Sequence, residues 1–355
     1  MSDNRLQNFY KNKKVLITGH TGFKGSWLSL FLKELGAEVY GYALEPDKSR
    51  ANLFSLAKID DKIKSYIADI SDIKSLEKVI NKTKPQIIFH LAAQSLVRDS
   101  YNNPVDNYRT NVMGTVNLLE VAKNLKSLKA VINITTDKCY ENNEWYWPYR
   151  ENDKLGGHDP YSASKACSEI ITDSYRKSFY TERRIGLASA RAGNVIGGGD
   201  FSKDRIIPDI VESIKNKKTV ILRNPKAVRP WQHVLDVLNG YLILGQKLYE
   251  NPQEFSEAFN FSLMENQEIN VEAIAQQFIS VIGKGEYKID KNKANLHEAQ
   301  ILKLDSSKAL KKLNWKPKYK TQDAITNAAL WYKSFLTSSN LDSLCQEDLN
   351  NFIRK

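Results

Sequence analysis

The sequence predicts an α/β fold built on a doubly wound parallel sheet, with a smaller C-terminal region interleaved with it. Short apolar runs typical of strands alternate with amphipathic segments typical of helices through the first half of the chain. A glycine-rich turn joins the first apolar run to the first helical segment. Polar residues follow several of the runs directly, where the carboxyl ends of parallel strands would meet.

The first predicted strand is Lys14–Thr18, and the glycines after it have the spacing Gly-x-x-Gly-x-x-Gly. Gly19, Gly22 and Gly25 allow a tight turn, close approach of a pyrophosphate to the backbone, and close packing of the next helix. The N-terminus of that helix would face the phosphates. Together they predict a Rossmann-like dinucleotide site; the alternative is an ordinary strand-to-helix turn.

The remaining elements alternate along the chain. We expect further strands at 38–42, 65–68, 86–91, 129–135 and 184–190. We expect helices at 24–36, 72–84, 104–124 and 159–179. Because ligands gather at the carboxyl ends of parallel strands, four segments should converge on one crevice. These are Thr18-Gly19, Ala92-Ala93-Gln94, Thr135 to Lys138, and Arg191 to Asn194.

After Asn194 the predicted elements become shorter, and cations and rings follow the glycine-rich turn at 197–199. This change indicates a second region that holds the substrate. We therefore divide the chain into a dinucleotide-binding domain at 1–190, a mainly substrate-binding region at 191–336 that is interleaved with it, and a polar C-terminal tail at 337–355.

Tyr161 and Lys165 form a Tyr-x-x-x-Lys pair in a helical segment, so they lie one turn apart on the same face. The ammonium can lower the pKa of the phenol and make it a useful base near neutral pH. Pairs of this kind also occur on solvated helix faces, so the neighbouring motifs are needed to assign a catalytic role to this one.

Thr136-Asp137-Lys138 adds an acid and an amine at the end of a predicted strand. The alternative for Asp137 and Lys138 is a salt-bridged pair.

Composition and charge argue against several other classes of protein. The chain has 355 residues, of which 41% are hydrophobic and 26% charged, so it can bury a sizeable core. We find no apolar stretch of membrane-spanning length and no apolar core of a signal peptide, and we expect a cytoplasmic protein without a membrane partner. The net charge is +11, but the lysines are spread along the chain, so we expect no specific nucleic-acid partner.

Cys139, Cys167 and Cys345 lie far apart and form no Cys-x-x-Cys pair. We expect neither a disulfide framework nor a metal site. Cys139 follows Lys138 directly, but a packed thiol is the commoner role for such a residue.

Taken together, the motifs resemble the extended short-chain dehydrogenase/reductases that modify nucleotide sugars. The resemblance rests on Thr18, Gly19, Gly22, Gly25, Asp69-Ile70, His90-Leu91-Ala92-Ala93-Gln94, Asn111, Thr135, Tyr161, Lys165 and Arg191-Ala192-Gly193-Asn194-Val195. Within this superfamily, Gly22-Phe23-Lys24-Gly25 and Arg229-Pro230-Trp231-Gln232-His233 are similar to the CDP-glucose 4,6-dehydratases. The dTDP-glucose dehydratases carry Thr-Asp-Glu where this chain has Thr136-Asp137-Lys138. That difference is typical of the CDP-glucose branch.

The resemblance implies NAD as the cofactor, CDP-glucose as the substrate and loss of water as the reaction. Tyr161 would take the proton from the hydroxyl on sugar carbon 4, with Thr136 holding that oxygen. Asp137 would protonate the hydroxyl that leaves carbon 6, and Lys138, or a water that it positions, would remove the proton from carbon 5. The product would belong to deoxysugar biosynthesis, as in lipopolysaccharide O-antigen.

Binding roles are also implied by the resemblance. Cofactor contacts would come from Thr18, Gly19, Thr21, Gly22, Phe23, Lys24, Gly25, Asp69, Ile70, Leu91, Ala92, Ala93, Gln94, Asn111, Thr135, Tyr161 and Lys165. Substrate contacts would come from Arg191, Asn194, Arg229, Trp231 and His297. Asp69 alone also suits a helix cap, and a surface salt bridge is the alternative role for an arginine.

The sequence allows alternatives for the cofactor, for the reaction and for the number of subunits. The second strand ends without the acidic residue that holds the adenosine ribose in many relatives, and Lys48 or Arg50 would tolerate the 2′-phosphate of NADP. A nucleotide-sugar 4-epimerase would use Tyr161 and Lys165 without Asp137, and a non-catalytic regulator can share the fold. Relatives commonly pair through two helices, here 104–124 and 159–179, so we expect a homodimer or homotetramer.

Overall fold

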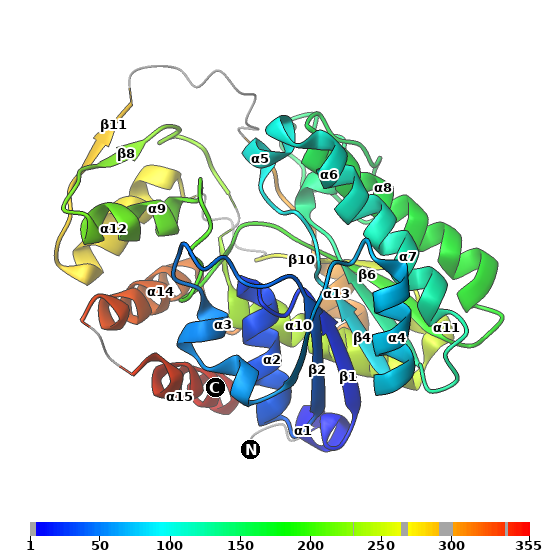
Figure 1. Cartoon of the computed structure of the whole chain (residues 1–355). Helices are drawn as coiled ribbons and strands as arrows, with labels where there is room; N and C mark the ends of the chain where they lie inside the picture. Colours follow the sequence, from blue (N-terminus) through cyan, green and yellow to red (C-terminus); the bar gives the residue numbers. More distant parts are fainter. Residues whose placement is uncertain (1–4, 230, 264–268, 291–300, 338–339) are drawn as a thin grey trace.

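A seven-stranded parallel sheet forms the centre of the molecule (Figure 1). The computed structural model describes residues 5–229, 231–263, 269–290, 301–337 and 340–355. The strands stand in the order β10-β6-β5-β4-β1-β2-β3, and every neighbouring pair is parallel. Their bounds are β1 Lys14–Thr18, β2 Glu38–Ala43, β3 Lys64–Ile67, β4 Ile87–His90, β5 Ala130–Ile134, β6 Gly186–Ala192 and β10 Ala258–Phe261. The order steps outward from β1 in both directions, which confirms the predicted doubly wound sheet.

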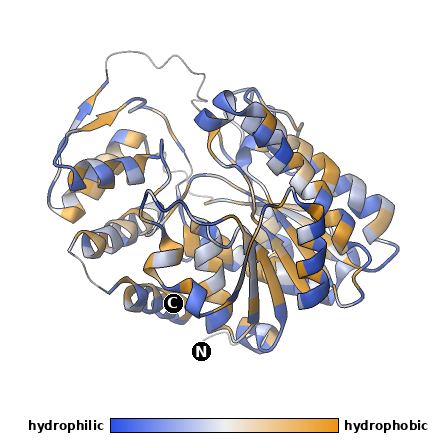
Figure 2. Cartoon of the chain, viewed as in Figure 1, coloured by the Kyte–Doolittle hydropathy of each residue, from blue (hydrophilic) through white to orange (hydrophobic). Residues whose placement is uncertain are grey.

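Helices cover both faces of this sheet because parallel strands bury side chains on both sides. Val15 and Ile17 of β1 pack in the same core as α2 (Phe23–Glu34) and α10 (Val234–Glu250). Leu16 points to the other face, where α4 (Ile73–Thr83), α7 (Gly114–Ala122) and α8 (Pro160–Tyr175) complete a second core. Figure 2 shows the apolar residues concentrated on the strands, with polar residues on the outer sides of the helices.

The C-terminal half adds a lobe beside the carboxyl edge of the sheet (Figure 1). Its main elements are α9 Ile206–Lys215, β8 Val220–Leu222, α12 Val271–Ile282, β11 Tyr287–Ile289 and α14 Thr321–Leu336. The shorter helices and strands are α1 Arg5–Tyr10, α3 Leu53–Leu56, α5 Val97–Asn102, α6 Pro104–Tyr108, β7 Val195–Ile196, β9 Gln232–His233, α11 Pro252–Phe255 and α13 Ser307–Leu313. Single turns of 3₁₀ or π helix lie at Ile59–Asp61, Arg109–Met113, Asp137–Cys139 and Arg176–Tyr180.

Two elements differ from the sequence-based expectation. Strand β10 comes from the C-terminal region and pairs with β6, with Ala258 opposite Ser189. Its run Ala258-Phe259-Asn260-Phe261 is short and carries a polar residue, so it gave no clear strand signal. Residues 337–355, expected to form a polar tail, contain helix α15 (Leu341–Arg354).

Helix α15 docks on the core through a stripe of buried side chains at helical spacing: Leu341, Cys345, Leu349 and Phe352. The ring of Phe352 meets that of Phe31 in α2 edge to face, with 6.0 Å between centroids. The polar residues that suggested a tail occupy the outer face of this helix.

Within the described ranges, no helix combines the length and apolar character needed to cross a membrane. The same residues contain no group of three or more His, Cys, Asp or Glu side chains placed to hold a metal ion. All three cysteines are free, and Cys139 and Cys345 are buried.

We predict that Phe352→Ala destabilises the protein by about 3–5 kcal/mol, because the substitution leaves a cavity where a fully buried ring packed against α2. Urea unfolding followed by circular dichroism measures the change. Asn351→Ala, at an exposed position on the same helix, is the matched control and should change the stability by about 0.5 kcal/mol or less. Equal stability of the two variants would show that α15 does not stabilise the fold.

Candidate active site

A cavity of about 640 Å³ lies at the carboxyl edge of the sheet, between the sheet and the C-terminal lobe. Its wall is formed by the segments that follow β1, β2, β3, β4, β5 and β6, together with α9, the start of α12 and the loop after β8. This is the place where ligands bind in open parallel sheets. The four segments that were expected to converge all reach this region.

The glycine turn forms the floor of one end of the cavity. Gly19 has φ +78°, and a Cβ there would lie 2.7 Å from the backbone nitrogen of Ala92. A Cβ on Gly25 would overlap the carbonyl oxygen of Gly19. Helix α2 begins at Phe23, so the unpaired N–H groups of its first turn face the cavity. Such groups can bind an anion. The turn therefore has the shape and polarity of a pyrophosphate site.

The cofactor residues predicted from the resemblance divide into two sets. Those that line the cavity are Gly19, Thr21, Gly22, Phe23, Lys24, Gly25, Asp69, Ile70, Leu91, Ala92, Ala93, Thr135, Tyr161 and Lys165. Thr18, Gln94 and Asn111 are not among the described residues that line it.

These three residues support the wall from behind. The Thr18 hydroxyl is hydrogen-bonded to His90 Nδ1 at 2.7 Å and accepts a bond from the Ala92 N–H at 3.2 Å. Asn111 exchanges two hydrogen bonds of 2.9 Å with the backbone of Gln94. These contacts hold the loop after β4 in place. Spacing along the sequence did not reveal this supporting role of Thr18 and Asn111.

At the end where an adenosine would lie, the cavity is lined by Ala43, Leu44, Asp69 and Ile70. The Asp69 carboxylate accepts a hydrogen bond from the Ser71 N–H at 2.8 Å. The alternative role of Asp69 as a helix cap is wrong, because Asp72 caps α4. Lys48 pairs with Glu45 at 2.8 Å, and Arg50 donates to the Phe201 carbonyl at 3.3 Å.

All five predicted catalytic residues, Thr136, Asp137, Lys138, Tyr161 and Lys165, line the cavity. Tyr161 and Lys165 lie in the first turns of α8, where Asp159 caps the helix by accepting from the Ser162 N–H at 2.9 Å. Burial raises the pKa of Tyr161 to about 12, while a hydrogen bond with Thr136 and the charge of Arg205 act in the opposite direction. Burial also lowers the pKa of Lys165 to about 8.

Asp137 begins a tight turn that Thr136 caps. The Thr136 hydroxyl donates to Asp137 Oδ1 at 2.9 Å and accepts from the Lys138 N–H at 3.3 Å. Asp137 Oδ2 is buried and has no hydrogen-bond partner in the part of the chain that the structure describes. A Cβ on Gly193 would overlap this carboxylate, so only glycine leaves room for it. Asp137 thus lines the cavity as a buried acid, with Oδ2 enclosed against Gly193.

The predicted substrate residues are only partly brought to the cavity. Asn194, Arg229 and Trp231 line it. His297 lies outside the described residues. Arg191 is not among the described lining residues, because its buried guanidinium forms an ion pair of 2.8 Å with Glu169. The geometry does not support a direct contact of Arg191 with the substrate.

Further cations line the cavity that sequence reasoning did not single out: Arg98, Lys203 and Arg205. Arg205 pairs with Asp200 at 2.9 Å, and Arg98 lies 3.7 Å from Asp204, which also pairs with Arg223. Lys203 and Arg205 are two residues apart in one loop, whereas Arg98 lies in α5, so only the fold brings Arg98 to the other two. The sequence analysis had noted cations after the glycine-rich turn, and two of them, Arg223 and Arg229, line the same cavity.

The sheet, the glycine turn, and the Tyr-Lys pair that shares a cavity with the buried acid Asp137 define the chain as an extended short-chain dehydrogenase/reductase. More particularly, the chain belongs to the GDP-mannose 4,6 dehydratase family, whose family model matches residues 16–328. It is 45% identical over 352 residues to the CDP-glucose 4,6-dehydratase of Salmonella typhimurium, covering 98% of each chain. It is also 31% identical to the dTDP-D-glucose 4,6-dehydratase of Dictyostelium discoideum, over 66% of this chain and 56% of that protein. The predicted resemblance is confirmed.

Solved structures share the fold. The dTDP-glucose 4,6-dehydratase of Bacillus anthracis, in complex with NAD, matches with a TM-score of 0.74 at 24% identity, over 91% of this chain and 97% of that one. The UDP-glucose 4-epimerase of Thermotoga maritima, with UDP-glucose, matches with a TM-score of 0.77 at 22% identity, over 91% and 99%. Epimerases and dehydratases thus share this architecture.

We predict that Gly25→Ala weakens NAD binding by about tenfold or more, equivalent to about 1.4 kcal/mol, because the added methyl group displaces the Gly19 backbone from the phosphate turn. Isothermal titration calorimetry with NAD measures the affinity. Lys33→Ala, at an exposed position of the same helix, should leave it unchanged. Equal affinities of the two variants would place the phosphates elsewhere.

Proposed function

We propose that this chain is an NAD-dependent CDP-glucose 4,6-dehydratase that converts CDP-D-glucose to CDP-4-dehydro-6-deoxy-D-glucose and water. The observation that carries the proposal is Asp137, a buried acid that lines the same cavity as Tyr161 and whose Oδ2 has no hydrogen-bond partner among the described residues. An elimination needs such an acid for the leaving hydroxyl, whereas an epimerisation at carbon 4 does not. The similarity to the Salmonella typhimurium enzyme supports CDP-glucose as the substrate.

The two ends of the cavity suit two different ligands. The glycine turn and the N-terminus of α2 would hold the pyrophosphate of NAD, with Asp69 and Ile70 near its adenine. NAD is favoured over NADP because Lys48 and Arg50 already bond to Glu45 and to the Phe201 carbonyl. Residues 1–190 then form the cofactor domain, and 191–336 form most of the substrate site.

Other cations that line the cavity would neutralise the diphosphate of the substrate. Arg205, Arg223 and Arg229 are suited to this role because a guanidinium can bond two phosphate oxygens at once. Arg98 and Lys203 add positive charge at the same place. Trp231 lines the same cavity and offers an apolar wall.

NAD, when bound, would supply the hydride acceptor for sugar carbon 4 and the hydride donor for carbon 6, and carbon 5 would regain a proton as the hydride adds. Tyr161 takes the proton from the carbon 4 hydroxyl while Thr136 orients that oxygen. The resulting ketone makes the carbon 5 hydrogen acidic, and Lys138, or a water that it positions, removes it. Asp137 gives a proton to the hydroxyl that leaves carbon 6.

A 4-epimerase is the second candidate, because solved epimerases share the fold and because Tyr161 and Lys165 would serve both reactions. The fold alone does not separate the two activities. A non-catalytic dinucleotide-binding regulator is the remote alternative, and the set of five polar residues that line one cavity argues against it.

We also propose that the protein is cytoplasmic and forms a homodimer or homotetramer. Val105, Tyr108 and Met113 are exposed on the helical segment 104–122, and Ile170 is exposed on the neighbouring α8. Large apolar side chains gathered on two packed helices are typical of a surface that a second copy covers. The product would feed deoxysugar biosynthesis, as for lipopolysaccharide O-antigen.

The proposal predicts that, of CDP-, dTDP-, UDP- and GDP-glucose incubated separately with the protein and NAD, only CDP-glucose loses one water. Mass spectrometry of the product measures this loss. A product of unchanged mass in which carbon 4 is inverted would establish the epimerase instead. Water loss from a different nucleotide would keep the reaction and change the substrate.

We predict that Asp137→Asn slows dehydration by about 10²–10⁴-fold, because the amide is a far poorer proton donor to the leaving hydroxyl. Oxidation at carbon 4 should survive, so nicotinamide absorbance should rise in a single turnover and fail to decay. Tyr161→Phe is the matched comparison, and it should block the rise itself. If Asp137→Asn blocks oxidation as completely as Tyr161→Phe does, then Asp137 is not the elimination acid.

A further inference from the structure

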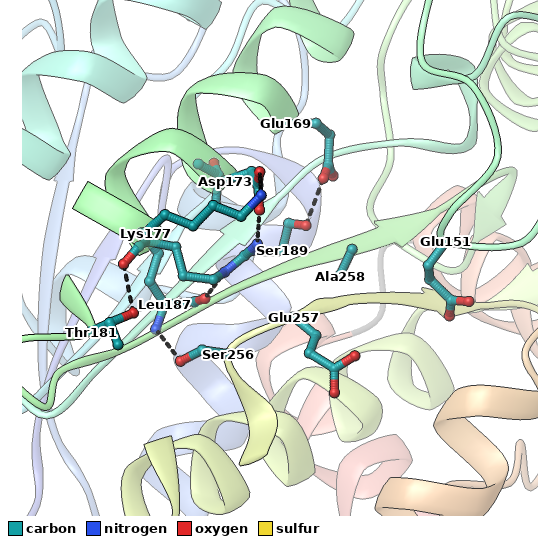
Figure 3. Close-up of polar contacts among 12 residues, drawn as sticks. Glu151, Glu169, Asp173, Lys177, Thr181, Leu187, Ser189, Ser256, Glu257 and Ala258 are labelled. Carbon is teal, nitrogen blue, oxygen red and sulfur yellow. Dashed lines mark hydrogen bonds and ion pairs between the residues drawn. The ribbon is translucent and has the colours of Figure 1, made fainter. Parts of the chain in front are cut away.

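A buried ion pair lies behind the catalytic turn and joins α8 to β6. Glu169 Oε2 and Arg191 Nη2 are 2.8 Å apart, and the two side chains are 3% and 4% exposed. Glu169 also accepts a hydrogen bond from the Ser189 hydroxyl at 2.6 Å (Figure 3), and another from the Thr135 hydroxyl.

The contacts of the pair reach both ends of the segment that carries Thr136, Asp137 and Lys138. At the N-terminal end of this segment, Glu169 accepts a hydrogen bond from the Thr135 hydroxyl. At the other end, Arg191 Nη1 donates to the Tyr140 hydroxyl at 2.7 Å, and its guanidinium lies 4.9 Å from the centre of the Tyr140 ring. The catalytic turn is therefore held at both ends by one pair of charges.

Tyr140 is itself fixed by a stack of aromatic rings that leads to the surface. Its ring stacks on Tyr149 with 5.1 Å between centroids, and Tyr149 stacks on Trp145 at the same distance. The Tyr140 hydroxyl also donates to Asn260 of β10 at 2.8 Å. Arg191 thus connects the turn, through Tyr140, to the ring stack and to β10.

Stability alone does not account for such a pair. Burying two charges costs several kcal/mol per ion, and apolar replacements of similar volume are often neutral or stabilising. Glu169 lies one turn beyond Lys165 on α8, on the same face of the helix. The charge of Glu169 acts to raise the pKa of Lys165, against the burial that lowers it to about 8.

We infer that Glu169, held by Arg191, is a positioning residue for the proposed reaction: it fixes the catalytic turn relative to α8 and places a negative charge one helical turn from Lys165. This inference rests on the proposed function. Arg191 then serves the site through Glu169 and Tyr140, in place of the substrate contact that the resemblance implied.

Other titratable groups lie around Glu169 and Lys165 on each packed element. The turn after β5 contributes Asp137, Cys139 and Tyr140, β6 contributes Arg191, and the far end of α8 contributes Asp173 and Arg176. Lys24 of α2 and His90 of β4 also interact with Lys165. Burial lowers the pKa of His90 to about 3 and raises that of Cys139, so both are neutral near pH 7.

The test is Glu169→Gln, which removes the charge and nearly keeps the shape. Because the folded-state pKa of Lys165 should fall, its ammonium should be lost at lower pH. The alkaline limb of the kcat profile with CDP-glucose should therefore move down by about one pH unit. At pH 7 the loss of the ammonium alone should lower kcat by about twofold or less, because a pKa about one unit below 8 leaves about half of Lys165 charged. A fall of about tenfold or more at pH 7, with KM changed by less than about threefold, would report the displaced catalytic turn. Glu169→Asp retains the charge and should restore the wild-type position of the limb.

A matched control tests whether any buried carboxylate would do the same. Asp236 is buried on α10 and accepts bonds from the Lys318 and Tyr319 N–H groups, away from the cavity. Asp236→Asn should lower stability and leave the alkaline limb in place. If Glu169→Gln does not fold, the double variant Glu169→Gln with Arg191→Met removes both charges and is expected to show a smaller shift in the same direction, because the repulsive charge of Arg191 is lost as well.

A readout without turnover separates this inference from the proposed function. In ¹³C-labelled lysine NMR of the free protein, with the signal of Lys165 assigned from Lys165→Arg, Glu169→Gln should lower the pKa of Lys165 by about one unit. An unchanged pKa and an unchanged alkaline limb would reduce the pair to a structural role. Failure of the wild type to dehydrate any sugar nucleotide would overturn the proposed function, while the NMR titration would still decide whether Glu169 holds the charge of Lys165.

Discussion

The close packing of the glycine turn against the ends of β2 and β4 is the constraint on which the cavity depends. The Gly19 N–H donates to the Tyr42 carbonyl at 2.8 Å, and the Leu91 N–H donates to the Thr18 carbonyl at 3.0 Å. There is no space for a side chain at Gly19 because the backbone of Ala92 lies against it. Three strands therefore end at the same level, and the loops that follow them open together onto one cavity.

Charge within this cavity is arranged by burial as much as by pairing. Burial raises the pKa of Tyr161 to about 12 and lowers that of Lys165 to about 8. Both shifts favour the neutral forms, so a base and its neighbouring ammonium need charged partners to work near neutral pH. Arg205 and Glu169 supply such charges from two different elements. The site is thus a network in which distant residues set the protonation of the central pair.

The same fold serves relatives that epimerise and relatives that dehydrate, so chemistry has to be argued from the site. Tyr161 and Lys165 suit oxidation of a hydroxyl in either case. Asp137, enclosed against Gly193 with one oxygen unpartnered among the described residues, is what favours elimination. Thr135 and Tyr140, which flank the turn that carries Asp137, are hydrogen-bonded to Glu169 and Arg191 respectively. The ion pair therefore links the position of Asp137 to α8, which carries Tyr161.

The sequence by itself determined the alternation of strands and helices, the glycine turn and the Tyr161–Lys165 pair, because these depend on periodicity and on residues close together in the chain. Only the tertiary structure decided the partner of Arg191, the supporting positions of Thr18, Gln94 and Asn111, and the gathering of Arg98 with Arg205. It also turned an expected tail into α15 and added β10 to the sheet. Where a buried charge finds its counter-charge depends on contacts between distant segments, and those arise only when the chain packs.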